Sequence, residues 1–150
     1  SLLQNEAAQA PFLGMKNAAA TPAAGEADCE RAYGELPKPY DVCILGMGND
    51  GHTASFFPHA QGLEQALDAG SDQLCKAITA KQSDVTGVHT ERMTLTLSAI
   101  LQAKEIKLLI TGEDKLKVYR QALLGDDEQE MPVRSILKQG LKPVTVYWAP

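Results

Sequence analysis

Two short apolar segments, each followed at once by a turn that contains glycine, constrain the fold of this chain more than any other feature of its sequence. Residues 40–45 (YDVCIL) form a run that is typical of a strand covered on both faces of a sheet. Residues 105–111 (EIKLLIT) are the clearest second strand, and they end at Gly112. Helical patterns separate and follow these segments. Strands that alternate with helices predict an α/β fold with three layers and a mostly parallel sheet.

The other predicted elements follow from capping and turn residues. Thr21 can cap a helix, Pro22 suits its first turn, and Gly34 supplies its end. The further predictions are helices at residues 1–10, 99–104 (capped by Ser98) and 113–124, strands at residues 74–79, 92–97 and 144–148, and a turn near residues 133–137. No internal repeat, low-complexity tract or linker divides the chain, so we expect residues 1–150 to form a single α/β domain.

The composition limits the partners and the location of the protein. Of the 150 residues 44% are hydrophobic, and 14 Lys and Arg stand against 19 Asp and Glu, for a formal net charge of -5. No basic run could neutralise consecutive phosphates, so we expect no nucleic acid partner. The apolar segments are far shorter than the roughly 20 residues of a membrane helix, so we expect no membrane partner. The widely spaced Cys29, Cys43 and Cys75 predict a reducing, cytoplasmic location, and no pattern favours a particular oligomeric state.

The turn after the first apolar segment holds the strongest candidates for a site, because ligands of open α/β sheets bind at the carboxyl ends of strands. Residues 45–55 (LGMGNDGHTAS) fit the GxGxxG pattern of dinucleotide sites. Dinucleotide binding is the weakest hypothesis, because Pro58 interrupts the short helix expected after His52 and no suitable acidic strand end follows. A neutral imidazole in such a loop could act as a general base near pH 7, and we favour this role for His52 over simple packing in the turn.

The turn after the second apolar segment predicts a binding site for an anion. Lys115 lies in the first turn of the helix expected at residues 113–124, where free N–H groups attract an anion and an ammonium adds a charge suited to phosphate. Alternatively, Lys115 is a surface residue paired with Glu113 or Asp114. Arg92 could supply a second cationic contact through its guanidinium, or could be a solvated residue at the end of a strand.

Three motifs resemble those of the 6-phosphogluconolactonase family. They are residues 45–58 (LGMGNDGHTASFFP), residues 92–97 (RMTLTL) and residues 111–115 (TGEDK), in the family's order. The resemblance covers essentially all 150 residues, which look like about the C-terminal three-fifths of a family member. The family's early Gly-Gly-Thr loop and its acidic Asp-Glu-Arg segment are missing, so we expect the chain to be the C-terminal part of a longer lactonase domain. The implied fold is Rossmann-like and resembles that of glucosamine-6-phosphate deaminases, ribose-5-phosphate isomerases and CoA transferases.

The resemblance implies hydrolysis of 6-phospho-D-glucono-1,5-lactone to 6-phospho-D-gluconate in the oxidative pentose phosphate pathway, without a metal or other cofactor. His52 would then be the base that activates water, and Asp50 would orient its imidazole or contact sugar hydroxyls. The resemblance assigns substrate binding to Gly48, Gly51, Arg92 and Lys115. The glycines would let the backbone approach the sugar, with their N–H groups facing a developing oxyanion. The two cations would hold the 6-phosphate of this phosphorylated sugar lactone.

Two other functions stay open beside the lactonase. Glucosamine-6-phosphate deaminases share the fold and a similar Asp-Gly-His loop, but their chemistry adds a carboxylate shortly after the histidine. No carboxylate occurs between His52 and Glu64 here. A non-catalytic sugar-phosphate sensor could keep Lys115, yet it would have no need of His52. We therefore favour the lactonase over a deaminase-like isomerase and over a sensor domain.

Overall fold

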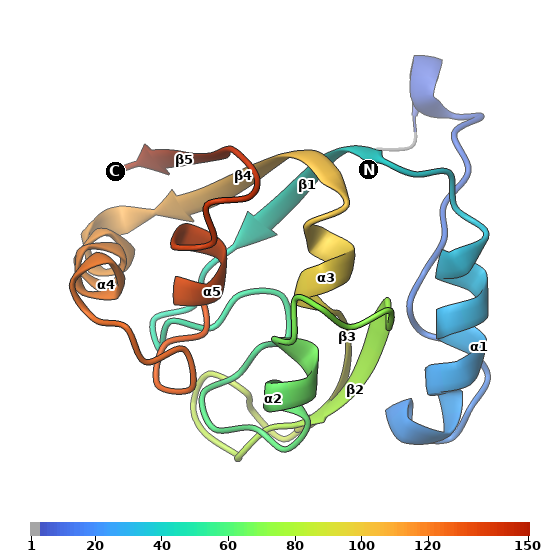
Figure 1. Ribbon diagram of the computed structural model, residues 1–150, viewed down its shortest axis with the longest axis horizontal. Coiled ribbons are helices and arrows are strands. Elements are labelled where there is room, and N and C mark those ends of the chain that lie inside the picture. The colour runs from blue at the N-terminus through green and yellow to red at the C-terminus, as the bar shows by residue number, and fades with distance from the viewer. Residues whose placement is uncertain (1–3) are drawn as a thin grey trace.

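Residues 4–150 are described by a computed structural model of the chain. Its elements are η1 (Asn5–Ala7), α1 (Pro22–Gly34), β1 (Tyr40–Gly46), α2 (Leu63–Ala66), β2 (Cys75–Thr79), β3 (Glu91–Leu95), α3 (Leu97–Ile100), β4 (Ala103–Thr111), α4 (Gly112–Leu124), α5 (Arg134–Leu137) and β5 (Val144–Ala149). Strands β1, β4 and β5 form one sheet in the order β1-β4-β5, while β2 and β3 form another. Figure 1 shows the three-stranded sheet along one side of the molecule, with α3, α4 and α5 beneath it.

The three-stranded sheet is parallel throughout, which confirms the predicted α/β class with a mostly parallel sheet. Gly46, the last residue of β1, lies opposite Leu109, near the end of β4. Adjacent parallel strands end at the same edge of a sheet, so the turn after β1 and the start of α4 lie at one carboxyl edge. This edge positions the candidate site.

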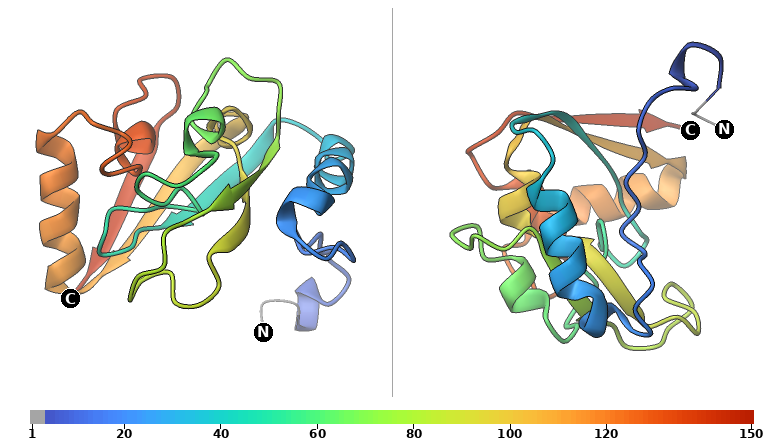
Figure 2. Two further views of the ribbon diagram at one scale, coloured as in Figure 1. Left: turned by 90° about the horizontal axis from the view of Figure 1, so that it is seen from below. Right: turned by 90° about the vertical axis from the view of Figure 1, so that its right-hand side faces the viewer.

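One face of the parallel sheet is uncovered by residues 4–150. The inner face is buried in the main core through Leu45, Ile106, Leu108 and Ile110. On the opposite side, which we call the outer face, Val42, Ile44, Leu109 and Tyr147 are 46%, 63%, 47% and 52% exposed. Helices α3, α4 and α5 pack on the inner face in Figures 1 and 2. For residues 4–150 the prediction that β1 is covered on both faces is therefore wrong. The apolar sequence of a strand indicates that both faces could be buried, but it does not indicate which segments are present to cover them.

Strands β2 and β3 confirm the predicted strands near residues 74–79 and 92–97, but they lie outside the parallel sheet. They pair with each other in antiparallel register, with Ala77 opposite Met93. Residues 80–90 connect them without a helix. A parallel pair needs a crossover of a dozen or more residues, whereas an antiparallel pair can be joined by a loop. The short connection therefore decides the pairing.

The predicted bounds of α1 and α4 are confirmed to within one residue, whereas both ends of the helix predicted at residues 99–104 are wrong. Thr21 Oγ1 accepts a hydrogen bond from Ala24 N at 3.2 Å at the start of α1, as its capping role requires. Before β4, the cap is Thr96 and not Ser98, because Thr96 Oγ1 accepts from Ala99 N at 3.1 Å. That helix ends at Ile100, since β4 begins at Ala103 and not after residue 104.

The helix expected at residues 1–10 is only the single turn η1 in the described residues, and residues 1–3 lie outside them. None of the residues of η1 is buried, and an isolated short helix is only marginally stable without packing. Within residues 4–150, no helix has the length and apolar character that a membrane crossing requires.

Helix α1 is attached to strand β2 by two carboxylates one helical turn apart. Glu30 accepts hydrogen bonds from the backbone N–H groups of Leu74 and Cys75 at 2.8–2.9 Å. Glu26 accepts one from Ala77 N at 2.7 Å. The carboxylates thus satisfy backbone donors of a strand that lies at the edge of its sheet.

Candidate active site

Asp50 and His52 form a close pair in the turn after β1. Asp50 Oδ1 lies 2.6 Å from His52 Nδ1 and also accepts a hydrogen bond from the backbone N–H of His52 at 3.1 Å. Burial acts to raise the pKa of Asp50, but the hydrogen bonds from the His52 ring and backbone outweigh it, so this pKa lies below its ordinary value. Because a carboxylate only accepts, Nδ1 of the imidazole carries the proton of this bond, and in the neutral ring Nε2 keeps a free lone pair.

The imidazole is also held by its neighbours in the turn. The ring of Phe57 lies 4.4 Å from the His52 ring, centroid to centroid. Thr53 Oγ1 donates a hydrogen bond to Gly46 O at 2.7 Å and so ties the turn to the end of β1. Phe57 lies in the motif of residues 45–58, but the sequence did not indicate a role for it, because nothing in its spacing from His52 predicts contact with the imidazole.

The short helix expected after His52 is absent from the structure. Ala54 instead has φ 50°, and Thr53 and Phe56 form an isolated β-bridge that closes a tight turn. The next helix, α2, begins only at Leu63 and has four residues. A dinucleotide site places the pyrophosphate at the N-terminus of a helix that starts directly after the glycines. The structure therefore contradicts the dinucleotide hypothesis.

Both glycines of the turn are required by close approach. A Cβ on Gly48 would lie 2.2 Å from His52 Nδ1, so only glycine leaves room for the imidazole. Gly51 has φ +78° and lies against Met131, where a Cβ would be 3.0 Å from that side chain. The N–H of Gly48 donates to His52 O, and that of Gly51 donates to Gly48 O. Both N–H groups are thus used inside the turn, and the expectation that they face an oxyanion is wrong.

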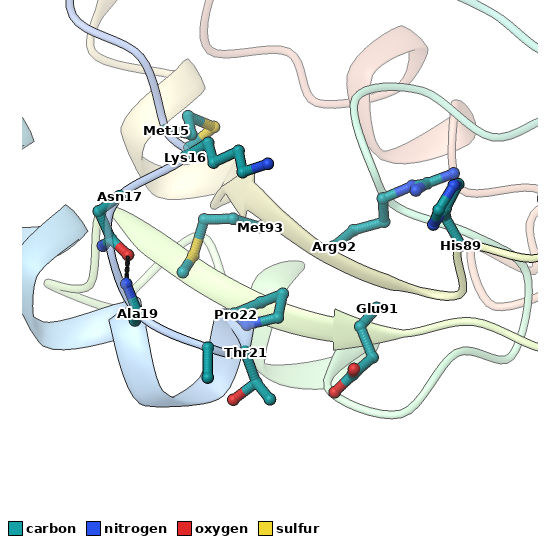
Figure 3. Close-up of a pocket in the computed structure, with 11 residues that line it drawn as sticks. Met15, Lys16, Asn17, Ala19, Thr21, Pro22, His89, Glu91, Arg92 and Met93 are labelled. Carbon is teal, nitrogen blue, oxygen red and sulfur yellow. Dashed lines mark hydrogen bonds between the residues drawn. The ribbon is translucent and has the colours of Figure 1, made fainter.

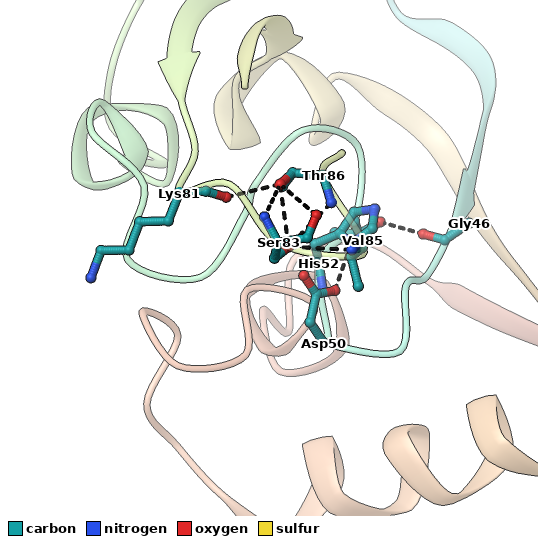
Figure 4. A network of polar contacts seen from close by, with 8 residues as sticks. Gly46, Asp50, His52, Lys81, Ser83, Val85 and Thr86 are labelled. Atoms are coloured by element: carbon teal, nitrogen blue, oxygen red, sulfur yellow. Dashed lines mark hydrogen bonds and ion pairs between the residues drawn. The ribbon is translucent and has the colours of Figure 1, made fainter. Parts of the chain in front are cut away.

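A cavity of about 410 Å³ opens beside this pair. Its walls are Asp50, Phe57, Pro58, Lys81, Ser83, Asp84, Val85 and Thr86. Figure 4 shows that residues 81–86 form a hydrogen-bonded loop next to Asp50 and His52, and Thr86 Oγ1 accepts from Ser83 N at 2.8 Å. The volume lies in the range of small-molecule sites. Lys81 is a cavity residue that the sequence did not indicate, because it lies far from each motif along the chain.

Lys115 lies at the same carboxyl edge as His52, in the first turn of α4. In the described part of the chain it makes no ion pair, and Asp114 pairs instead with Lys117 at 3.2 Å. The alternative that Lys115 pairs with Glu113 or Asp114 is therefore wrong. The ammonium stays available at the N-terminus of a 13-residue helix.

Arg92 does not line the cavity beside Asp50. Its Nη2 donates to Thr86 O at 3.2 Å, so it reaches that cavity only through the loop of residues 81–86. It lines a different cavity of about 420 Å³ together with Lys16, His89 and Glu91 (Figure 3). The structure thus brings Gly48, Asp50, Gly51 and His52 together, places Lys115 at the same sheet edge and leaves Arg92 behind the loop.

This arrangement can act as a general base, because Asp50 holds the imidazole of His52 in a fixed orientation. His52 is 21% exposed and Asp50 26% exposed, so the pair is held in the protein but open to a small reactant. No group of three or more His, Cys, Asp or Glu side chains within residues 4–150 is placed to hold a metal ion.

Comparison with known proteins relates this chain to sugar-phosphate enzymes. The sequence model of the family described as glucosamine-6-phosphate isomerases/6-phosphogluconolactonase matches residues 1–148. A protein of Rhizobium meliloti named 6-phosphogluconolactonase is 39% identical over 150 residues, which are 100% of this chain and 62% of that protein. A protein of Pseudomonas aeruginosa with the same name is 39% identical over 149 residues, which are 99% of this chain and 59% of that protein.

A comparison with solved structures supports the same relationship. The crystal structure of a 6-phosphogluconolactonase from Shewanella baltica matches with a TM-score of 0.90 and 44% identity, over 99% of this chain and 61% of that chain. The chain therefore spans about three-fifths of the length of these relatives. The match of the family model along nearly the whole chain shows that the chain belongs to the glucosamine-6-phosphate isomerase/6-phosphogluconolactonase family.

Proposed function

We propose that the gene product containing this chain hydrolyses 6-phospho-D-glucono-1,5-lactone to 6-phospho-D-gluconate, a step of the oxidative pentose phosphate pathway. The observation that carries the proposal is the Asp50–His52 pair, with 2.6 Å between Oδ1 and Nδ1, at the edge of a cavity of about 410 Å³. Relatives with the name 6-phosphogluconolactonase support the choice of substrate.

In the proposed mechanism, His52 Nε2 removes a proton from a water molecule while the water oxygen attacks the lactone carbonyl carbon. The bond between that carbon and the ring oxygen then breaks, and the imidazolium returns the proton to the ring oxygen. Asp50 keeps the proton of His52 on Nδ1 and stabilises the imidazolium that forms transiently. One imidazole therefore serves as base and then as acid, and the proton balance closes without another group.

Substrate binding is proposed to rest on the phosphate. Lys115 contributes an ammonium beside the free N–H groups of α4. Arg92 is proposed as the second cation, and it acts from outside the cavity beside Asp50, through the loop that its guanidinium holds at Thr86 O. A phosphate held away from the lactone carbonyl uses its binding energy to align that carbonyl with the base. Gly48 and Gly51 keep the turn thin enough for the sugar to approach its backbone.

We also propose that residues 1–150 are the C-terminal part of a longer lactonase domain. The outer face supports this idea, because parallel sheets are normally covered on both faces while Val42 and Ile44 are exposed here. A cytoplasmic location is proposed from the three cysteines, which are free thiols in the structure.

The proposal predicts that His52→Ala abolishes lactone hydrolysis in the complete gene product without unfolding it. Loss of a general base lowers the rate by roughly 10²–10⁴-fold. The lactone also opens spontaneously, so the rate is measured above that background, and circular dichroism checks the fold. Asp72→Ala is the control, because Asp72 is exposed and lies outside both cavities. Unchanged turnover in His52→Ala would contradict the role of His52.

A further inference from the structure

Arg134 is a buried cation for which the proposed mechanism has no use. It is the first residue of α5 and is only 5% exposed. Its Nε donates to Ala122 O at 3.3 Å, and its Nη1 donates to Asp127 O at 2.8 Å and to Glu130 Oε2 at 2.7 Å. Burying a guanidinium costs free energy that its hydrogen bonds must offset. If the side chain at this position only filled space in the core, an apolar residue would do so without that cost. What this arginine supplies is a set of directed bonds.

Those bonds hold the chain between α4 and α5 in one conformation. Ala122 belongs to the last turns of α4, whereas Asp127 and Glu130 belong to the connecting segment, residues 125–133. A Cβ on Gly125 would lie 2.1 Å from Arg134 Nη2, so the guanidinium lies directly against the backbone there. The planar fork of one arginine thus joins the end of a regular helix to an irregular segment.

The same segment contacts the turn of His52 on both sides of the histidine. Before it, Gly51 O accepts a hydrogen bond from Val133 N at 2.9 Å, and Met131 packs against Gly51, where an added Cβ would lie 3.0 Å from that side chain. After it, His59 N donates to Gln129 O at 3.0 Å. The segment therefore supports the backbone that carries the imidazole from Gly51 to His59.

We propose that Arg134 is a positioning residue for His52, acting through residues 125–133. The proposal rests on the proposed function, because it assigns to Arg134 the alignment of the base for lactone hydrolysis. A displacement of about 1 Å in a catalytic group can lower a rate by roughly 100-fold. Loss of the guanidinium bonds lets the segment move, and Gly51 and the His52 ring move with it.

The test uses Arg134→Lys and Arg134→Met in the complete gene product, with kcat and KM measured at a temperature where each variant is folded. Lysine keeps the charge but loses the fork, and methionine keeps the length but loses every donor. We expect kcat to fall roughly 10- to 100-fold in both, with KM within about 2-fold of the parent. Met131→Ala keeps the arginine but removes the packing on Gly51, and it is expected to lower kcat in the same direction.

Ile100→Val is the control for stability, because Ile100 is buried in α3 and the substitution removes one methylene group from the hydrophobic core. We expect Ile100→Val to lower the midpoint of thermal unfolding while kcat stays at the parent value. Parent-like kcat in folded Arg134→Lys and Arg134→Met overturns the proposal. If neither folds, parent-like kcat in Met131→Ala overturns it.

A second measurement separates this proposal from the proposed function. Absence of lactonase activity in the parent would overturn the function but not the positioning. The amide hydrogen exchange of Gly51 and His52 then decides, because both amides are hydrogen-bonded within the turn. Faster exchange at these amides in Arg134→Lys than in Ile100→Val supports positioning by Arg134, and equal exchange overturns it.

Discussion

At the scale of single residues, the orientation of one imidazole depends on three neighbours that act in different ways. Asp50 accepts the hydrogen bond of Nδ1, Phe57 lies against the ring, and Gly48 leaves the space that the ring occupies. A hydrogen bond decides the tautomer, and contact decides the ring plane. Because these contributions are separate, they can be removed one at a time.

Asp50→Asn is expected to lower kcat by roughly 10²–10⁴-fold while the fold is kept. The amide NH₂ of asparagine can donate to Nδ1, which moves the imidazole proton to Nε2 and removes the free lone pair. Steady-state kinetics on the lactone checks the loss, and Asp72→Asn is the control because Asp72 is exposed and lies outside the cavity. Equal rates in the two variants would disprove the tautomer argument.

The same pair has a consequence for stability in acid. The pKa of Asp50 in the folded state lies below its ordinary value of 3.8, so the ionised carboxylate of Asp50 stabilises the fold fully above about that pH. This contribution is lost as the pH falls through the lower folded pKa. The difference in free energy of unfolding between the parent and Asp50→Asn, measured by urea unfolding, is therefore expected to shrink on acidification below pH 3.8. A difference that does not depend on pH would contradict this expectation.

At the scale of elements, the two 13-residue helices, α1 and α4, have different roles. Helix α4 follows β4 without a loop and presents its N-terminus at the carboxyl edge of the sheet. Helix α1 lies beside β2 and supplies carboxylates to its backbone. The first arrangement suits binding of an anion, whereas the second completes a strand that has a neighbour on one side only.

Lys115→Ala is expected to weaken binding of 6-phosphogluconate by roughly 10- to 100-fold, because a hydrogen bond to a charged group contributes about 1.5–3 kcal/mol. Calorimetric titration of the variant measures the loss. Lys117→Ala is the matched control on the same helix, since Lys117 is exposed and paired with Asp114. Parent-like affinity in Lys115→Ala would show that this lysine does not bind the phosphate.

Glu30→Gln is expected to lower the free energy of unfolding by about 1–3 kcal/mol. The amide keeps one oxygen acceptor, whereas the carboxylate bonds two backbone N–H groups, those of Leu74 and Cys75, through both oxygens. Urea unfolding compares it with Glu35→Gln, which changes an exposed glutamate just after α1. The same loss in both variants would mean that docking of α1 does not depend on Glu30.

At the scale of the whole molecule, the outer face is an apolar surface that residues 4–150 leave exposed. Its apolar members Val42, Ile44, Leu109 and Tyr147 come from all three strands of the parallel sheet. Burial of one such side chain contributes about 1.5–3 kcal/mol, so a covering layer would add substantially to stability. The relatives are longer than this chain, and the proposed longer domain has residues for such a layer.

Ile44→Glu is expected to lower the free energy of unfolding of the complete gene product by at least about 2 kcal/mol, because it would bury a charge under that layer. In the isolated 150 residues the same change lies on an exposed face, and the effect is expected to stay within about 0.5 kcal/mol. Chemical unfolding of the four proteins measures both effects. Equal effects in the complete gene product and in the isolated 150 residues would contradict the proposal that a further layer covers the outer face.

The sequence by itself determined the elements whose causes are local. The cap at Thr21, the helix between Gly112 and Leu124, and the apolar strands β1 and β4 were all predictable, because capping, glycine and periodicity act over a few residues. The contact between Asp50 and His52 was predictable for the same reason, because the two residues are close along the chain.

Only the tertiary structure decided the features that depend on residues far apart in the sequence. The cavity beside Asp50 needs the loop that contains Lys81, and the separation of Arg92 from that cavity follows from its bond to Thr86. The support of the His52 turn by the segment under Arg134 joins residues about eighty positions apart. Such contacts depend on how strands pair and helices pack, and no local pattern records them, because packing chooses partners by shape and position in space.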